Sequence, residues 1–171
     1  AQSAAERESD LRIRVETELL AQADRLLAAT PAEEAQLQWL YRADTSRVTV
    51  IPPGVDLNLF YPRPAAEAKA RIGVDPNKKL LIFVGRIEPL KGVETLMRAI
   101  ALLCERGVSE CHRLCLSIIG GDPADDPAVS NAEMERLKAL REELGLAEVV
   151  TFIGAQDQDA LPDYYAAAEV V

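Results

Sequence analysis

The chain has 171 residues with 19 basic and 28 acidic side chains, and its formal net charge is −9. This acidic balance argues against nucleic acid or an anionic membrane surface as the main partner, although a local cluster of donors can still bind a small anion. No apolar run reaches the ~20 residues of a membrane span, and no signal-peptide pattern opens the chain. We therefore expect a soluble, cytoplasmic protein.

Disulfide bonds and metal sites have little support in the sequence. The three cysteines, Cys104, Cys111 and Cys115, form no even disulfide set, so we expect reduced thiols and a reducing compartment. Cys111 to Cys115, with the single histidine His112 between them, faintly resembles a metal site. A zinc site of the usual spacing needs a second ligand pair, and none follows, so we expect no metal.

The amino-terminal third reads as two helices and a strand. Apolar residues at three- and four-residue spacing predict an amphipathic helix over 7–27. Thr30 is a predicted N-cap for a second helix, 31–41. The β-branched stretch 47–51 predicts a strand, and prolines end it before a connector over 52–64. We expect this region to pack on the rest of the chain through leucines, namely Leu19, Leu27, Leu37 or Leu40.

After Pro64, strands alternate with helices. Strands are predicted at 79–84, 114–119, 149–153 and from Val170, and helices at 65–71, 93–106, 131–144 (with Ser130 as N-cap) and 159–167. This alternation predicts right-handed βαβ units, hence an α/β fold with a Rossmann-like parallel sheet and helices on both faces. Because the last residues read as half of a buried strand, we expect an excerpt of a longer protein.

The loops that follow the strands are the candidate ligand site, because open parallel sheets bind ligands at the carboxyl ends of their strands. In the loop 85–92, Gly85 permits close approach of a ligand. Arg86 and Lys91 then precede a helix N-terminus, a combination suited to a diphosphate. The alternative is that both cations pair with Glu88 or Glu94 on the surface.

The other candidate positions are less specific. Gly120 and Gly121 either admit a ligand or simply end a strand, and no dinucleotide fingerprint is present. Three aspartates could bind a hard cation, but their spacing favours a solvated loop; these are Asp122, Asp125 and Asp126. With one histidine far from these loops, no Ser–His–Asp set can be assembled. Tyr164 and Tyr165 are expected to pack against the core.

Five segments in chain order carry a resemblance to a known family. They are VIPPGVD (50–56), FVGRIEPLKG (83–92), IIGG (118–121), VTFIG (150–154) and DYYAAAE (163–169). The chain resembles the retaining, nucleotide-sugar-dependent glycosyltransferases of family 4, which have the two-domain GT-B fold. Within that family it is most similar to the branch holding the inositol-phosphate N-acetylglucosaminyltransferase and bacterial sucrose-phosphate synthases.

The resemblance implies a division of the chain and a set of site residues. Residues 1–51 would end the acceptor-binding domain, 52–62 would be the interdomain crossover, and 63–171 would be the first half of the donor-binding domain. Arg86 and Lys91 match the catalytic pair that holds the donor diphosphate; the other implied donor-binding residues are Gly85, Gly120 and the backbone near Gln156. The implied co-substrate is a nucleotide-sugar, with UDP favoured, and there is no cofactor or metal; the acceptor stays unknown.

The family's paired-glutamate motif would lie beyond Val171, so we expect this excerpt alone to be inactive. The alternative from another class is a non-catalytic nucleotide- or phosphate-binding module, which would lack those glutamates. A third alternative, nucleotide-sugar epimerisation on the same fold, lacks the motifs quoted above.

Overall fold

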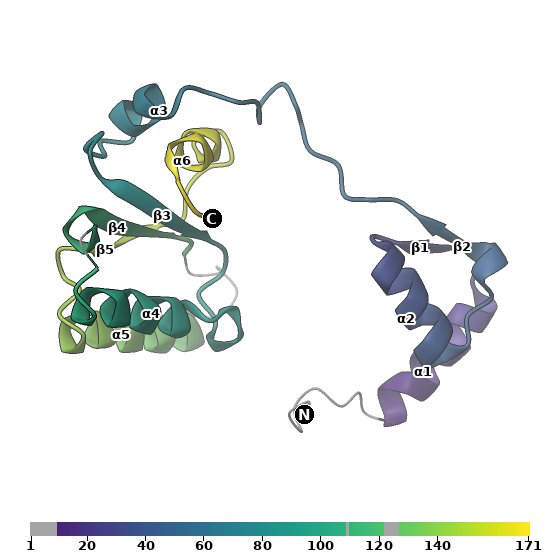
Figure 1. The fold of residues 1–171 in the computed structure, drawn as a ribbon. Coiled ribbons are helices and arrows are strands. Elements are labelled where there is room, and N and C mark those ends of the chain that lie inside the picture. The colour runs from purple at the N-terminus through teal and green to yellow at the C-terminus, as the bar shows by residue number, and fades with distance from the viewer. Residues whose placement is uncertain (1–9, 109, 122–126) are drawn as a thin grey trace. The chain divides into compact units, whose positions relative to one another are not determined.

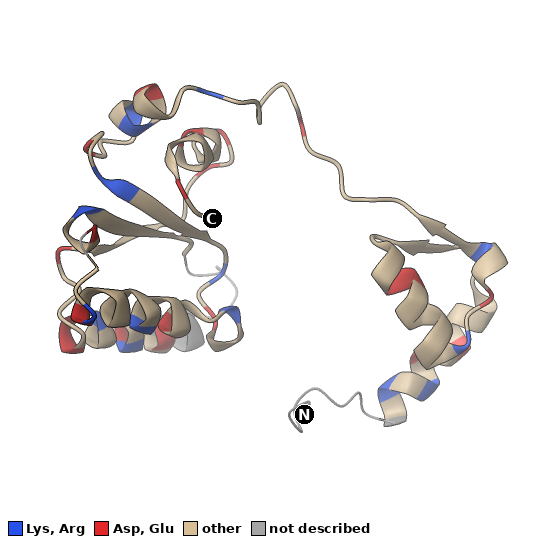
Figure 2. Ribbon diagram, in the orientation of Figure 1, with Lys and Arg blue, Asp and Glu red and all other residues tan. Residues whose placement is uncertain are grey.

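A computed structural model describes residues 10–108, 110–121 and 127–171 (Figure 1). The chain forms two compact units, unit 1 over Ala1–Asp56 and unit 2 over Leu57–Val171. Each unit carries both basic and acidic residues (Figure 2). None of the helices within the described ranges combines the length and the apolar character that a membrane crossing requires.

Unit 1 is a small helix–strand arrangement. Its elements are α1 (Asp10–Gln22), β1 (Leu26–Ala28), α2 (Pro31–Tyr41), the 3-10 turn η2 (Thr45–Arg47) and β2 (Val48–Val50). The Thr30 hydroxyl accepts a hydrogen bond from the Glu33 N–H at 3.1 Å, which confirms the predicted cap of α2. The strands β1 and β2 pair in parallel, with Leu26 opposite Val48.

The predicted first helix over 7–27 is too long. The structure ends α1 at Gln22 and places Leu26–Ala28 in a strand, where Leu26 and Ala28 are buried while Leu27 is 67% exposed. That alternation has a period of two residues, which is the side-chain period of a strand rather than of a helix. Parallel pairing with β2 supplies the backbone hydrogen bonds that a three-residue strand needs.

Unit 2 contains the predicted parallel sheet. Its elements are α3 (Ala65–Arg71), β3 (Lys79–Val84), the 3-10 turn η3 (Pro89–Lys91), α4 (Val93–Glu105), the 3-10 turn η4 (Cys111–Arg113), β4 (Leu114–Ile119), α5 (Pro127–Glu143), β5 (Val150–Gly154) and α6 (Leu161–Ala167). The strands lie in the order β3-β4-β5 and are parallel throughout. Val170 forms a parallel bridge with Leu81, beside β3.

Helices cover both faces of this sheet, α4 and α5 on one and α3 and α6 on the other (Figure 1). The α4/α5 face buries an aliphatic cluster that includes Met97, Ile118 and Leu137. The opposite face buries a smaller cluster around Leu80 and Ile82. Burial on both faces explains why the strands read as continuous apolar runs. The predicted α/β class is confirmed.

Two details of unit 2 differ from the sequence expectations. Helix α5 begins at Pro127, so Ser130 lies inside the helix and is not its N-cap; proline is well suited to the first turn of a helix, where its missing N–H costs nothing. Cys104 and Cys111 form a disulfide with Cα atoms 5.3 Å apart, so the expectation of reduced thiols is wrong for this pair. Gly107, with a φ of 69°, ends α4 and turns the chain back toward Cys104.

The connector is exposed at its start and anchored at its end. Val55 and Leu57 are exposed, whereas Phe60 packs edge-on against Tyr165 with ring centroids 6.0 Å apart. The boundary between the units, after Asp56, falls inside the range 52–62. The domain roles attached to these ranges, and the packing expected of Leu19, Leu27, Leu37 or Leu40, stay predictions.

Candidate functional site

The three strands of unit 2 end level with one another, and a glycine lies at each end. The Gly85 N–H donates to the Ile119 carbonyl at 3.0 Å, and the Gly120 N–H donates to the Gly154 carbonyl at 3.0 Å. The loops after β3, β4 and β5 therefore leave the sheet at one common edge. Ligands bind at this edge in open parallel sheets.

Two glycines at this edge are required by close packing. A Cβ atom on Gly120, whose φ is +156°, would lie 1.8 Å from the Gly85 carbonyl oxygen. A Cβ on Gly121 would lie 2.9 Å from the Ala155 Cβ. No side chain fits in the first position, and the second has little room to spare. The loops after β3, β4 and β5 thus approach each other through bare backbone, which leaves peptide groups accessible to a ligand.

A cavity of about 280 Å³ lies above these glycines and draws residues from all three loops. It is lined by Val84, Gly85, Arg86, Ile119, Gly120, Gly121, Ala155, Gln156 and Leu161. Gly85, Arg86, Gly120 and Gln156, which the sequence analysis expected at a donor site, are thus brought together. Among the described residues its lining is largely apolar, with Arg86 and Gln156 as the polar side chains.

Arg86 lines this cavity, but Lys91 does not. Lys91 lies at the end of η3, exposed to solvent, and Gly92 and α4 follow it. The 3-10 turn reverses the chain between the two cations, as its hydrogen bond from the Lys91 N–H to the Glu88 carbonyl shows. Arg86 and Lys91 were expected to point into one cavity. Arg86 lines the cavity as expected, but Lys91 does not.

Arg86 also forms the surface ion pair with Glu88 that was the alternative to ligand binding. Its guanidinium lies 3.0 Å from a Glu88 carboxylate oxygen, and its side chain is 65% exposed. An exposed pair of this kind contributes between about zero and 1 kcal/mol, so an incoming anion can displace Glu88 at little cost. Lys91 makes no ion pair with any residue that the structure describes.

The start of α4 adds to the positive potential next to Lys91. Gly92, with a φ of 73°, is the N-cap and offers no side-chain acceptor to the first turn. The unpaired N–H groups of that turn carry the positive end of the helix dipole. Glu94 nearby pairs with Arg98 and Arg136 rather than with Arg86 or Lys91. Those pairs lower the pKa of Glu94, with Arg136 contributing most.

Other candidate groups lie elsewhere or outside the described residues. Asp122, Asp125 and Asp126 fall outside the described ranges. Among the residues that are described, no three carboxylate, imidazole or thiol groups gather as metal ligands would. His112 lies in η4, at the amino end of β4, where its backbone carbonyl accepts a hydrogen bond from Lys78.

Leu161 was not among the residues expected at the site, but it lines the cavity together with Ala155 and Gln156. It is the first residue of α6, whereas the sequence predicted a helix from Asp159. A signal was present in the sequence. Leu161 is the first large apolar residue after the third loop, at the edge of the sheet where ligands bind.

Two family models match the chain. The model described as glycosyl transferases group 1 matches residues 65–171, and that described as glycosyltransferase family 4 matches residues 2–59. The division between the two matches falls in the connector. Residues 65–171 contain the whole parallel sheet and all the residues that line the cavity.

Curated relatives and solved structures agree with these models. The chain is 41% identical over 165 residues to a D-inositol 3-phosphate glycosyltransferase of Actinosynnema mirum, covering 96% of this chain and 38% of that protein. A sucrose-phosphate synthase from Thermosynechococcus elongatus matches with a TM-score of 0.77 and 32% identity over 98% of this chain and 39% of its own.

A third similarity concerns the fold alone. Anabaena HepE, solved in complex with UDP, matches with a TM-score of 0.77 at 22% identity, over 98% of this chain and 43% of its own. The chain thus spans less than half the length of these relatives. The α/β architecture is the one found in GT-B glycosyltransferases. On the match over residues 65–171, the chain belongs to the family of glycosyl transferases group 1.

Proposed function

We propose that this chain forms part of a retaining family 4 glycosyltransferase that transfers a sugar from a nucleotide-sugar, with a UDP-sugar favoured, to an acceptor. The observation that carries the proposal is the cavity at the carboxyl edge of the sheet, which Gly85, Arg86 and Gly120 line together. Support for UDP comes from Anabaena HepE, which was solved with UDP and with UDP-glucose.

The cations next to the cavity suit the bond that such an enzyme breaks. When the sugar leaves, negative charge grows on the terminal phosphate of the nucleoside diphosphate. Arg86 can exchange its exposed pair with Glu88 for a bidentate contact with that phosphate. Lys91, on a flexible stem next to the α4 N-terminus, supplies a movable point charge. These groups would stabilise the leaving diphosphate without a resident metal or cofactor, and the nucleotide-sugar acts as co-substrate.

The other side of the cavity suits the nucleoside. Ala155 and Gln156 provide backbone groups after β5, and Leu161 provides an apolar surface. The Gln156 side chain donates a hydrogen bond to the Ala155 carbonyl at 3.0 Å, so it is the Gln156 backbone that is left for the base edge. A planar base packed on Leu161 would thus be read by main-chain groups.

The remaining assignments follow from the same family membership. Residues 1–51 would belong to the acceptor-binding domain, and 52–62 would be the crossover to the donor-binding domain. A cytoplasmic location, where nucleotide-sugars are made, fits a UDP-sugar donor. The acceptor itself would be set by residues outside this chain.

The test is kinetic and uses the full-length protein. Arg86→Ala and Lys91→Ala should each lower the rate of sugar transfer roughly 30- to 1,000-fold. This loss corresponds to about 2–4 kcal/mol of transition-state stabilisation. Lys138→Ala is the matched control, because Lys138 is an exposed lysine on α5 paired with Glu135, and it should leave the rate unchanged. Wild-type turnover and donor affinity in Lys91→Ala would remove Lys91 from the site. Donor binding without any transfer by the wild type would favour a non-catalytic binding module.

A further inference from the structure

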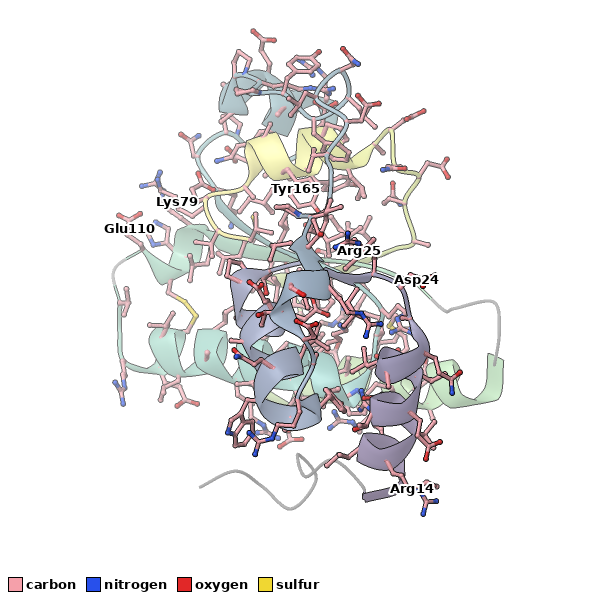
Figure 3. All side chains as sticks on the ribbon, turned by 90° about the vertical axis from the view of Figure 1, so that its right-hand side faces the viewer. Arg14, Asp24, Arg25, Lys79, Glu110 and Tyr165 are labelled. Atoms are coloured by element: carbon pink, nitrogen blue, oxygen red, sulfur yellow. A yellow bond between two sulfur atoms is a disulfide. The ribbon has the colours of Figure 1, made fainter. Side chains whose placement is uncertain are left out.

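The feature that the proposed activity does not use is the cysteine pair at the opposite end of the sheet from the cavity. Cys104 lies in the last turn of α4, and Cys111 opens η4 just before β4. Seven positions separate them in sequence, and their Cα atoms are 5.3 Å apart. That distance is within the range that a disulfide spans without backbone movement. In Figure 3 the sulfur–sulfur bond lies beside the labelled Glu110.

The packing of unit 2 fixes the positions of both cysteines. The buried face of α4, including Met97 and Ile100, holds the helix on the sheet. The turn after it is closed by hydrogen bonds from the Gly107 N–H to the Cys104 carbonyl and from the Cys111 N–H to the Val108 carbonyl. The two sulfur atoms are thus brought together by native structure, and not only by the bond between them.

The surroundings of the pair leave it open to small thiols and disulfides. Both cysteines are half-buried, and the described residues between them, 105–108 and 110, are exposed. Cys115 differs from them. Its thiol hydrogen faces the Lys79 carbonyl, with the sulfur 3.7 Å from that oxygen, and burial raises the pKa of its thiol. The fraction of Cys115 present as the reactive thiolate is therefore small.

We propose that Cys104 and Cys111 are a reversible redox pair, a site of covalent modification that interconverts between a dithiol and a disulfide. Oxidation uses a low-molecular-weight disulfide, such as glutathione disulfide. One cysteine thiolate attacks glutathione disulfide and releases one glutathione thiolate, which gives a mixed disulfide between the protein and glutathione. The second cysteine thiolate then attacks the protein sulfur of that mixed disulfide and releases the second glutathione thiolate. The pair loses two electrons and two protons, and the small disulfide becomes two thiols. A small dithiol reverses the reaction.

The position of the pair determines what its oxidation does. Helix α4 runs from the loop that carries Lys91 to Cys104, and β4 runs from beside Cys111 back to Gly120. Thirteen helical residues separate the two ends of α4, which is about 20 Å at 1.5 Å per residue. We therefore expect the disulfide to hold the far corner of the β3–α4–β4 unit together and to stabilise it. Donor binding at the other end should change little.

The experiment titrates the full-length protein with defined ratios of glutathione to glutathione disulfide. Trapping with iodoacetamide and peptide mass mapping should show the Cys104–Cys111 link forming as the ratio falls, with Cys115 alkylated throughout after denaturation. The oxidised protein should unfold at a temperature several degrees higher, and dithiothreitol should return it to the starting value. Cys115→Ser should keep this response, whereas Cys104→Ser or Cys111→Ser should abolish it.

Three outcomes would overturn the proposal. Both thiols could stay free at every ratio, the link could resist dithiothreitol in the native protein, or glutathione could remain attached without the internal link forming. If Cys104→Ser fails to fold, Cys111→Ser and the wild-type titration still decide the question, because mass mapping of the wild type needs no variant.

Discussion

Gly120 is the residue on which the geometry of the cavity depends most directly. A side chain there meets the Gly85 carbonyl oxygen, which is itself fixed because the Gly85 N–H donates to Ile119. The same position also has a φ of +156°, where side chains are rarely found. Steric overlap and backbone conformation thus act together, and the adjacent strand ends cannot separate without breaking the ladder.

Gly120→Ala should therefore destabilise the protein by about 3 kcal/mol or more, and should weaken nucleotide binding as the loops shift. Gly145→Ala is the matched control, because Gly145 has a φ of +65° but open space around its Cβ position; it should cost only about 1–2 kcal/mol. Urea denaturation of both variants measures the difference. Equal losses would mean that conformation alone, and not the contact with Gly85, makes glycine necessary.

A second residue-scale feature is the ion pair at the amino end of the sheet between the buried Lys69 and the partly exposed Glu169. The Lys69 ammonium donates to a Glu169 carboxylate oxygen at 2.7 Å and to the Lys78 carbonyl at 2.8 Å, and Lys69 is only 5% exposed. The other carboxylate oxygen of Glu169 accepts the Leu80 N–H at 2.6 Å. Burial raises the pKa of Glu169, but the contacts with Lys69 and Leu80 outweigh it and hold that pKa below its ordinary value.

Because the folded pKa of Glu169 is lowered, its contribution to stability is present above the ordinary glutamate pKa of 4.5 and is lost as the pH falls below it. Glu169→Gln should cost about 1–2 kcal/mol near neutral pH, since the buried ammonium loses its counter-charge while solvent screens the carboxylate, whose side chain is 35% exposed. The difference in the free energy of unfolding between the variant and the wild type should become smaller toward pH 3. Glu67→Gln, which removes an exposed carboxylate paired with Arg71, should cost little at any pH. A gap that does not depend on pH would contradict this account.

At the scale of elements, α4 and α5 are joined by apolar packing and by one charged bridge. Arg136 on α5 forms a two-point contact with Glu133 and reaches Glu94 on α4 at 2.6 Å. These contacts raise the pKa of Arg136, Glu133 contributing most, so the guanidinium keeps its charge at all ordinary pH values. The side chains of Arg136 and Glu94 are 47% and 34% exposed, so solvent screens their pair.

Arg136→Ala should therefore lower the free energy of unfolding slightly at low ionic strength, and by less in 1 M salt. Lys138→Ala removes a pair that lies within α5, and it should have almost no effect. Thermal unfolding at two salt concentrations tests both variants. A loss in Arg136→Ala that salt does not reduce would mean that packing of the arginine stem, rather than its charge, joins the helices.

The long elements were predictable from the sequence, and the short or long-range features were not. Strands β3, β4 and β5 can be recognised in the sequence because burial on both faces makes them continuously apolar. β1 has only three residues, and its leucines continue the spacing of the helix before it, so no local pattern marks the change. The disulfide depends on the turn at Gly107, which the sequence does not place in space. The same distinction applies to the cavity. The predicted strand ends place Arg86 and Gly120 at it, whereas the position of Lys91 depends on the short turn η3.

At the scale of the whole molecule, the chain divides after Asp56 into units that each bury their own residues. Unit 2 buries two clusters, one on each face of its sheet, and unit 1 buries Leu26 and Ala28 between its short elements. The connector between them is different. Residues 51–58 are exposed along their whole length, and Leu57 is 75% exposed. Prolines at 52 and 53 also remove two backbone donors from this stretch.

Limited proteolysis with chymotrypsin should therefore make its first cut among the described residues after Leu57, because cleavage requires an accessible backbone outside helices and strands. The fragment beginning at Asn58 should then persist, since the strands of unit 2 are buried on both faces. Mass spectrometry over a time course identifies the cut. Asn58→Pro should slow that cleavage without changing the stability of unit 2, because the protease does not cut before proline. A first cut within 79–121 or 127–154 would show that the sheet opens more readily than the connector.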